Sequence, residues 1–529
     1  MKELVFRDKK RATETEQAKP GRRSPKATGK LYGAKGDRVA LTAPNTLGDV
    51  QYALQLPIQT QAACFFMANF ATVPDQATSA GFMEFLVPMQ KTFPLPLHFE
   101  LAFDACALAS LNNRHIQDAT LRKRALDKYV KALASLSLVV RDPLASKDFT
   151  ALASTLLCSL FEHITGLDHE FSAWSAHIDG AIQLVQNIGR EELLQTELGR
   201  AIFGAVRLQM IIKSVGFVND KRLPLEWWTE GVFGDKTALE CERLMLGFLD
   251  LRWKVGNLLS KPSSNTNVQL GYMIMKCQVQ DAKFVEWTIN LPDYYKYETL
   301  GWADDVADDM ADDMADRFYR KLDVFPGRID DYSRGRGTLS VWNMMRVGRI
   351  GLSTLIIRCA AQMSSLSDYR TTPAYASAVQ TCTEAAADII ASVPCGLGWC
   401  PTSGRPSAQF VCGDDDASKG LHGVRLMMSL AIVHSLDYLT VAQRSYIQGR
   451  LQYIGTHLGI HRAAALCQVT PSRQPNPWES ILTLVQISLR VPSMRIARDS
   501  RRAASPTGGS KSFTSFGFPV GPIHTSTTA

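Results

Sequence analysis

Hydrophobic residues recur every three or four positions along much of the chain, and the clearest stretch runs from Ala125 to Gly189. Its last segment has the spacing of one buried helix face, with apolar side chains at Trp174, Ile178, Ala181, Val185 and Ile188. Gly189 follows directly, in the position where a glycine ends many helices. Gly180 interrupts the segment, and because a glycine inside a helix costs roughly 1 kcal/mol relative to alanine, we expect a neighbouring helix to approach it closely.

The same periodicity predicts helices in other parts of the chain. One begins after Asp148, a residue suited to capping a helix, and carries Phe149, Leu152, Leu156 and Leu160. Two further stripes consist of Leu198, Ile202, Val206 and Met210, and of Val341, Met345, Gly348, Leu352, Leu355 and Cys359. Alternating runs rich in Val and Ile are scarce, so we expect an all-α fold without a sheet. Long irregular connectors are predicted at 261–267 and 396–423, which are rich in Gly, Ser, Pro or Asp.

Three groups of residues carry a resemblance to a known family: Tyr129, Ala132 and Leu133; Leu156, Leu157 and Glu162; and Trp174, His177, Gly180, Ala181 and Leu184. In this order they resemble the core pattern of the fungal-specific transcription factor domain. Segments at 342–352, 388–394 and 453–466 resemble the later helices of that family, so the resemblance spans residues 63–489. It implies a large multi-helix regulatory bundle of the middle homology type. In this family the region usually lies downstream of a binuclear zinc-cluster DNA-binding domain.

The eleven cysteines bear on that zinc cluster. Such a cluster needs six cysteines in one run of about thirty residues, because two metal ions share six sulfurs in tetrahedral geometry. No two cysteines of this chain are separated by only two residues. The opening segment, MKELVFRDKKRATE, resembles the segment that follows the last zinc ligand in the family. Two alternatives follow: a natural regulator without a finger, or a gene model that has missed an upstream exon.

The net charge of +7 lies in one part of the chain. Residues 1–38 hold twelve Lys and Arg against five Asp and Glu, which equals the whole excess, so residues 39–529 are neutral. The basic residues include two clusters, Lys9, Lys10 and Arg11, and Arg22, Arg23 and Lys26. A flexible basic arm can contact phosphates without reading bases, or it can serve as a nuclear-import signal. A solvated linker without either role is the other interpretation.

Composition divides the chain into three parts. Residues 1–45 form a basic arm rich in Gly, Pro, Ser and Thr, residues 46–490 form the helical body, and residues 491–529 form a basic tail rich in Ser and Thr. We expect both termini to be disordered, because they contain too few apolar residues to form a core. The scattered cysteines favour a reducing compartment, and no run of eighteen apolar residues predicts a membrane span.

An acidic repeat suggests an alternative function. From Asp304 to Asp316 the sequence DDVADDMADDMAD contains overlapping DDxxD patterns, which resemble the arrangement that holds magnesium and diphosphate in helical terpene synthases. Aspartates at i and i+4 share a helix face and can offer hard oxygen ligands to Mg²⁺. The second metal-binding motif of those enzymes is not found, so a local sequence expansion on a solvated helix or loop is the favoured interpretation. A magnesium-dependent helical isoprenoid enzyme remains the alternative.

Other patterns give no catalytic centre. The sequence has no dinucleotide-binding GxGxxG, no P-loop, no GxSxG elbow and no HExxH. Cys395, Cys400, Cys412 and His422 are spaced too irregularly to predict a zinc site. His177 is interpreted as a hydrogen-bonded core histidine and Trp174 as a packing anchor. We therefore assign no catalytic residue, no metal ligand and no cofactor.

The predicted function is a transcription regulator of the fungal zinc-cluster family that lacks its own zinc finger and acts in the nucleus, in control of a metabolic gene cluster. The resemblance implies transcriptional co-regulators or related full-length transcription factors as partners. DNA is then contacted only indirectly or non-specifically, and a homodimer or heterodimer is compatible with the family. We expect no membrane association. A scaffold or ligand-binding module is a third interpretation.

Overall fold

The structure is a computed structural model, and it describes residues 56–71, 83–89, 91, 94–142, 148–167, 171–216, 225–230, 232, 234–261, 264–303, 312–332, 337–364, 368–397 and 419–467. The two basic clusters, the predicted limits at residues 45 and 490, and Cys400 and Cys412 lie outside these ranges.

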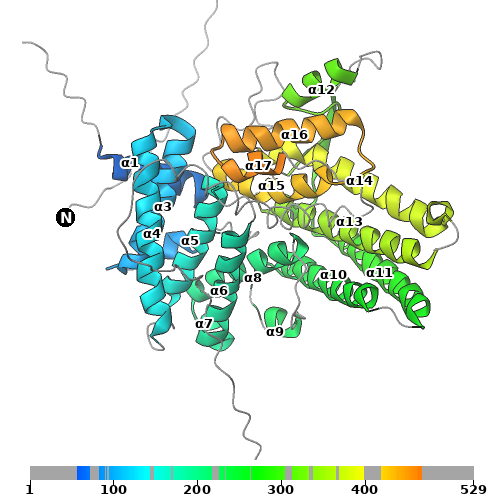
Figure 1. Ribbon diagram of the computed structural model, residues 1–529, viewed down its shortest axis with the longest axis horizontal. Coiled ribbons are helices and arrows are strands. Elements are labelled where there is room, and N and C mark those ends of the chain that lie inside the picture. Colours follow the sequence, from blue (N-terminus) through cyan, green and yellow to red (C-terminus); the bar gives the residue numbers. More distant parts are fainter. Residues whose placement is uncertain are drawn as a thin grey trace, which may run out of the picture. The chain divides into compact units, whose positions relative to one another are not determined.

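Seventeen α-helices occur in the described ranges (Figure 1). The first nine are α1 (Ile58–Phe70), α2 (Leu86–Met89), α3 (Leu97–Leu111), α4 (Ala119–Arg141), α5 (Phe149–Thr165), α6 (Ser172–Ile188), α7 (Arg190–Gln195), α8 (Glu197–Gly216) and α9 (Leu225–Thr229). The others are α10 (Lys236–Ser260), α11 (Thr266–Ile289), α12 (Asp312–Lys321), α13 (Thr338–Met363), α14 (Pro373–Gly396), α15 (Lys419–His434), α16 (Val441–Thr456) and α17 (His461–Cys467). Short π and 3-10 turns are η1 (Asn112–Ile116), η3 (Asp293–Tyr295) and η4 (Tyr369–Thr371). The all-α fold class is therefore confirmed.

Local signals in the sequence fix several helix ends. Asp148 precedes α5, and its carboxylate accepts a hydrogen bond from the Thr150 amide at 2.9 Å, as predicted for a cap. Helix α6 ends at Ile188, and Gly189 follows with a φ of +94°. The explanation expected for Gly180 is wrong: a Cβ there would have only the Thr155 methyl, at 3.9 Å, as a neighbour, so no close helix requires the glycine.

Two predicted connectors are shorter than expected. Helix α10 ends at Ser260 and α11 begins at Thr266, so the last two residues of the predicted loop at 261–267 are helical. Helix α14 continues to Gly396, and α15 already includes Gly423. The remainder of the connector at 396–423 lies largely outside the described residues.

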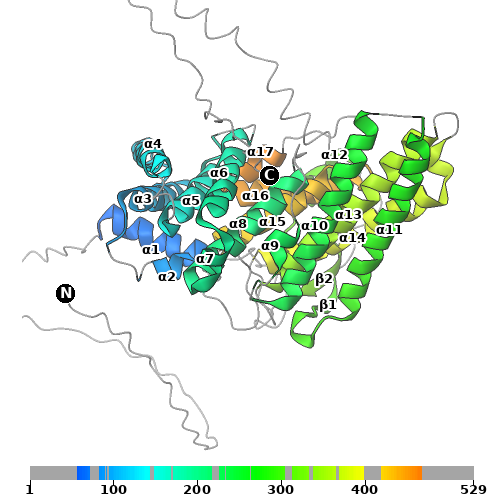
Figure 2. The same cartoon turned by 90° about the horizontal axis from the view of Figure 1, so that it is seen from below.

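The helices pack in three neighbouring groups (Figures 1 and 2). Helices α1, α3, α4, α5, α6 and α8 contact one another in the first group, and α10, α11, α13 and α14 form the second. Helices α15, α16 and α17 form the third, which contacts both others: α15 packs on α1, α13 and α14, and α17 packs on α5. The last helices of the chain therefore join the first two groups.

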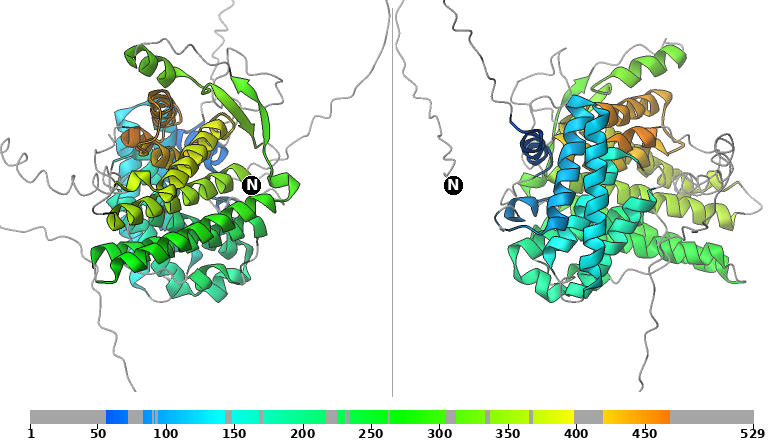
Figure 3. Two further views of the ribbon diagram at one scale, coloured as in Figure 1. Left: turned by 90° about the vertical axis from the view of Figure 1, so that its right-hand side faces the viewer. Right: turned by 60° about the vertical axis from the view of Figure 1, so that its left-hand side comes forward.

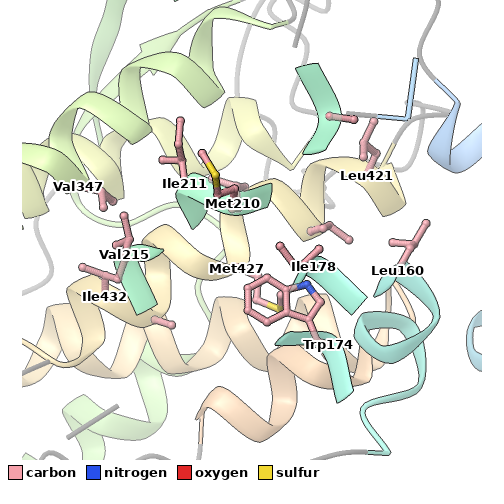
Figure 4. Packing of buried hydrophobic residues seen from close by; sticks show 14 of the residues in the cluster. Leu160, Trp174, Ile178, Met210, Ile211, Val215, Val347, Leu421, Met427 and Ile432 are labelled. Atoms are coloured by element: carbon pink, nitrogen blue, oxygen red, sulfur yellow. The ribbon is translucent and has the colours of Figure 1, made fainter. Parts of the chain in front are cut away.

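Buried apolar residues continue across these group boundaries. Figure 4 shows the centre of this packing, where Trp174 and Ile178 of α6 lie near Met427 of α15. The same view includes Met210, Ile211 and Val215 of α8, Val347 of α13 and Ile432 of α15. Trp174 and Ile178 are completely buried, which confirms Trp174 as a packing anchor.

A close backbone approach joins α5 to α17. Helix α5 ends at Thr165. Gly166 follows with a φ of +60°, which favours glycine, and a Cβ at this residue would lie 3.0 Å from the Arg462 amide nitrogen. Nearby, the Asn113 side-chain amide donates to the carbonyl of Ile164 at 2.8 Å and to that of Gly459 at 3.0 Å. The second of these hydrogen bonds joins residues that lie 346 positions apart in the sequence.

The expectation of a fold without any sheet is wrong in one place. Strands β1 (Glu298–Ala303) and β2 (Gly327–Asp331) form a two-stranded antiparallel sheet, in which Glu298 pairs with Asp331 and Ala303 with Gly327. Figure 2 shows the pair, and β2 contacts α14. The short sequence GRIDD of β2 lacks an alternating apolar pattern. Ion pairs of Arg328 with Asp330 and Asp388 help to hold the strand in place instead. Periodicity therefore gave no signal for it.

Candidate functional site

The residues that carried the family resemblance meet inside the first helix group. Tyr129 of α4 lies between Glu162 of α5 and His177 of α6. Its hydroxyl donates to Glu162 Oε1 at 2.7 Å and lies 2.8 Å from His177 Nε2. Its ring stacks on Phe161, with centroids 4.3 Å apart. Three helices are therefore tied together at one buried hydroxyl.

The protons of this cluster can be assigned by donor counting. Tyr129 has one hydroxyl proton, which goes to Glu162, so the oxygen must accept from His177 Nε2–H. Burial lowers the pKa of His177 from its ordinary value of 6.5 to about 4, so the imidazole is neutral at pH 7. His177 is hydrogen-bonded, as predicted, and its side chain is half-buried at the edge of the core.

Neither the hydroxyl nor the neighbouring thiols are prepared for nucleophilic chemistry. Burial and the Glu162 carboxylate raise the pKa of Tyr129 well above its usual range. Burial, with a smaller effect of Glu162, raises the pKa of Cys158 to about 12, and burial also raises that of Cys106. Protonated thiol and phenol groups are weak nucleophiles. The cluster positions helices rather than reacting groups.

A second buried polar cluster surrounds Arg346 of α13, whose side chain is only 1% exposed. Its guanidinium lies over three aromatic rings, those of Tyr297, Tyr332 and Trp342, at 5.5, 5.8 and 5.3 Å from the centroids. It donates to the Tyr332 hydroxyl at 2.8 Å and to Asn343 Oδ1 at 2.9 Å. Arginine keeps its charge when buried, and aromatic faces and hydrogen bonds offset the desolvation.

This cluster anchors the small sheet to the helices. Asp388 of α14 lies 3.6 Å from Arg346 Nε and also binds Arg328 of β2. Arg328 pairs in addition with Asp330 at 2.9 Å. This cluster was not predicted from the sequence, although Arg346 gives a signal there: it interrupts an apolar helix four residues after Trp342. An arginine on a core face needs buried partners.

The last residue of the acidic repeat has a structural role. Asp316 of α12 accepts from Arg320 at 2.9 Å and from the Ser445 hydroxyl of α16 at 2.6 Å. The Ser445 hydrogen bond, followed by that of Arg320, lowers the pKa of Asp316. The Arg320 carbonyl lies against Gly449, where a Cβ would overlap it. Asp316 therefore helps to hold α12 on α16.

The other predicted chemistry is only partly within the described residues. Asp304, Asp305 and Asp308 lie outside them, as do Cys400 and Cys412. Within the described ranges, no group of three or more His, Cys, Asp or Glu side chains is arranged to hold a metal ion. The Cys395 thiol lies 3.3 Å from the Tyr332 amide and 3.7 Å from Asp331 Oδ1. None of the helices in these ranges is both long enough and apolar enough to cross a membrane.

The fold is an all-helical domain, and its two buried polar clusters tie helices together. Residues 65–242 match the family described as "Fungal specific transcription factor domain". This span contains Tyr129, Glu162 and His177, so the resemblance inferred from them is confirmed.

A curated relative extends the similarity along the chain. Over 416 residues the protein is 24% identical to "Transcription factor dbaG" of Emericella nidulans (strain FGSC A4), and the alignment covers 78% of this chain and 91% of that protein. No solved structure matches the chain. The family and the relative both support a fungal transcription regulator, a class of proteins that are not normally enzymes.

Proposed function

We propose that this protein regulates transcription in the nucleus through protein contacts of its helical body. The observation that carries the proposal is the match of residues 65–242 to the transcription factor domain family. The formal neutrality of residues 39–529 adds support, because binding to DNA phosphates depends on Lys and Arg in excess. The body is therefore suited to transcriptional co-regulators or related full-length transcription factors, with DNA contacted indirectly or non-specifically.

The architecture supports a docking role over a catalytic one. Each of the two buried clusters fixes three elements relative to one another: α4, α5 and α6 at Tyr129, and β2, α13 and α14 at Arg346. A fixed helical surface reduces the conformational entropy that a partner must overcome on binding. Homodimers or heterodimers and the control of a metabolic gene cluster are the finer parts of the proposal.

Tethering tests the regulatory role directly. The full chain, fused to a foreign DNA-binding domain, should change transcription of a reporter gene in yeast relative to that DNA-binding domain alone. A matched fusion with Trp174→Asp, which places a charge in a fully buried site, should lose the effect because the core no longer forms. Equal reporter output from the wild-type fusion and the isolated DNA-binding domain, at equal protein levels, contradicts the proposal.

Nuclear entry is tested through the basic arm. A fluorescent fusion of the full chain should accumulate in the nucleus. We expect less accumulation when the basic residues of the arm are replaced by alanine, namely Lys9, Lys10, Arg11, Arg22, Arg23 and Lys26. Substitution of Lys123 and Arg124, two exposed basic residues of α4, is the control for lost charge. Unchanged accumulation in the arm variant would assign import to another segment.

A further inference from the structure

Helix α11 has one face that packs on the body. Its buried positions alternate spacings of four and three: Thr266, Leu270, Met273, Cys277, Gln280, Phe284 and Trp287. This face contacts α10 and α13, and Gln280 donates to the Leu244 carbonyl at 2.9 Å. In the left view of Figure 3, α11 crosses the side turned to the viewer. Its register on the body is therefore fixed.

A second stripe with the same spacing runs two residues further along the helix. Its members are Val268, Tyr272, Met275, Val279, Ala282, Glu286 and Ile289, and all of them are exposed. The apolar ones include Val268 at 77%, Val279 at 49% and Ile289 at 74% exposure. Three heptads of a helix extend about 32 Å, the length of a coiled-coil contact. Contiguous exposed apolar patches of this kind mark interaction sites.

The charges beside this stripe lie at defined positions. Lys276 and Lys283 are exposed, one heptad apart and on the same edge, and the Lys276 ammonium lies over the Tyr272 ring at 5.1 Å. Of the two acids of this helix, Asp281 is held by Arg349 of α13 at 2.8 and 3.1 Å, and Glu286 belongs to the stripe itself. Neither lysine forms an ion pair with another residue in the described part of the chain. Their edge of the stripe is therefore positive.

These charges disfavour pairing with a second copy of the chain. In a parallel pair, Glu286 would face Glu286 of the other copy within the seam. In an antiparallel pair like edges meet, so the lysine edges would face each other. Both arrangements bring like charges together, which is destabilising at such positions. A partner helix with Asp or Glu beside its apolar seam would place carboxylates opposite the lysines, and it would bring no second Glu286 into the seam.

We propose that the outer face of α11 docks an amphipathic helix of a partner protein, with Asp or Glu residues facing Lys276 and Lys283. This inference rests on the proposed function and names the chemistry of the co-regulator segment. The apolar stripe supplies the binding energy, and the two lysines select the acidic partner.

Designed peptides test the selection. Two labelled helical peptides of about four heptads carry Leu at the seam positions and either Glu or Lys at the flanking positions. With the full chain at low salt, the Glu peptide should bind roughly tenfold more tightly, and the difference should shrink as salt is added. The double variant K276E/K283E should reverse the preference. The double variant K123E/R124E, the same charge change at exposed positions of α4, should leave it unaltered.

A seam variant and a mass measurement complete the test. Val279→Asp places a charge on an exposed helix position, so the fold should persist by circular dichroism while binding of both peptides is lost. Equal affinity for the Glu and Lys peptides, or binding that Val279→Asp does not weaken, overturns the proposal. The proposal is also overturned if a mass measurement shows that the wild-type chain is a dimer and that Val279→Asp makes it a monomer. The stripe would then bind a second copy of the chain.

The docking surface and the regulatory role fail in different ways. If the Glu peptide binds with the expected preference but the tethered wild-type chain leaves the reporter unchanged, the proposed function is wrong and the surface remains. If the tethered chain regulates the reporter and Val279→Asp regulates it equally, the function remains and the surface is not the route to the co-regulator.

Discussion

Replacing Tyr129 by Phe removes one oxygen atom from the centre of the first helix group. The hydroxyl gives its proton to Glu162 at 2.7 Å and accepts from His177 at 2.8 Å, so both contacts are lost at once. The stacking of the ring on Phe161 is retained, because phenylalanine has the same ring. The change therefore isolates the polar contribution of the cluster from its packing.

The size of the effect follows from burial. Tyr129 is 7% exposed and Glu162 is 4% exposed, so water does not readily replace the lost donor. A hydrogen bond to a charged group contributes about 1.5–3 kcal/mol, and a buried group left without its partner costs about 1–3 kcal/mol. We expect Tyr129→Phe to lower the local stability of α4, α5 and α6 by about 2–4 kcal/mol. Tyr294→Phe, at a 42% exposed tyrosine, is the control and should change stability by less than about 0.5 kcal/mol.

Hydrogen exchange of the full chain, followed by mass spectrometry, resolves this effect by segment. Peptides from α4, α5 and α6 should exchange faster in the Tyr129→Phe protein, while peptides from α11 and α13 keep their protection. A double-mutant cycle with His177→Gln should show coupling, because the two residues share one hydrogen bond. Exchange in α4–α6 that matches that of Tyr294→Phe would show that the hydroxyl is not a tie between the three helices.

Three further predictions address packing, acid stability and the second cluster. Gly351→Ala should destabilise the protein by about 1–3 kcal/mol in thermal unfolding, since a Cβ there would overlap the buried Phe248 ring. Its control, Gly180→Ala, should stabilise the protein by up to about 1 kcal/mol, because a Cβ at Gly180 would meet only the Thr155 methyl at 3.9 Å. Stability should fall as pH decreases from 6.5 to 4, because the unfolded chain protonates His177, His163 and His434 in this window, whereas burial lowers the pKa of all three in the folded protein. His177→Gln should make this part of the pH profile less steep. Arg346→Met should cost about 3–5 kcal/mol in unfolding titrations, since its buried partners remain, and a cost below about 1 kcal/mol would show that they are solvated.

The spacing of apolar residues in the sequence was enough to predict the helices, but it did not predict the buried polar contacts between them. The stripe from Trp174 to Ile188 lies buried on one face of α6, as predicted, because a helix in a large body must bury its apolar side. The place of Glu162 was not predictable, since its role depends on α4 and α6 lying against α5. Arg346 shows the same limit: its partners come from a strand and a helix that periodicity does not bring together.

Helix α11 shows why the exposed stripe also needed the structure. Its sequence contains two sets of positions with identical spacing, one beginning at Thr266 and one at Val268. Both have the period of a helix face, so spacing alone cannot say which one enters the core. The buried set includes Phe284 and Trp287, large aromatic residues that fill the space beside α10 and α13, and this fixes the rotation of the helix. Once that rotation is fixed, the second set must face outward, and the proposed docking of a partner helix accounts for its apolar character.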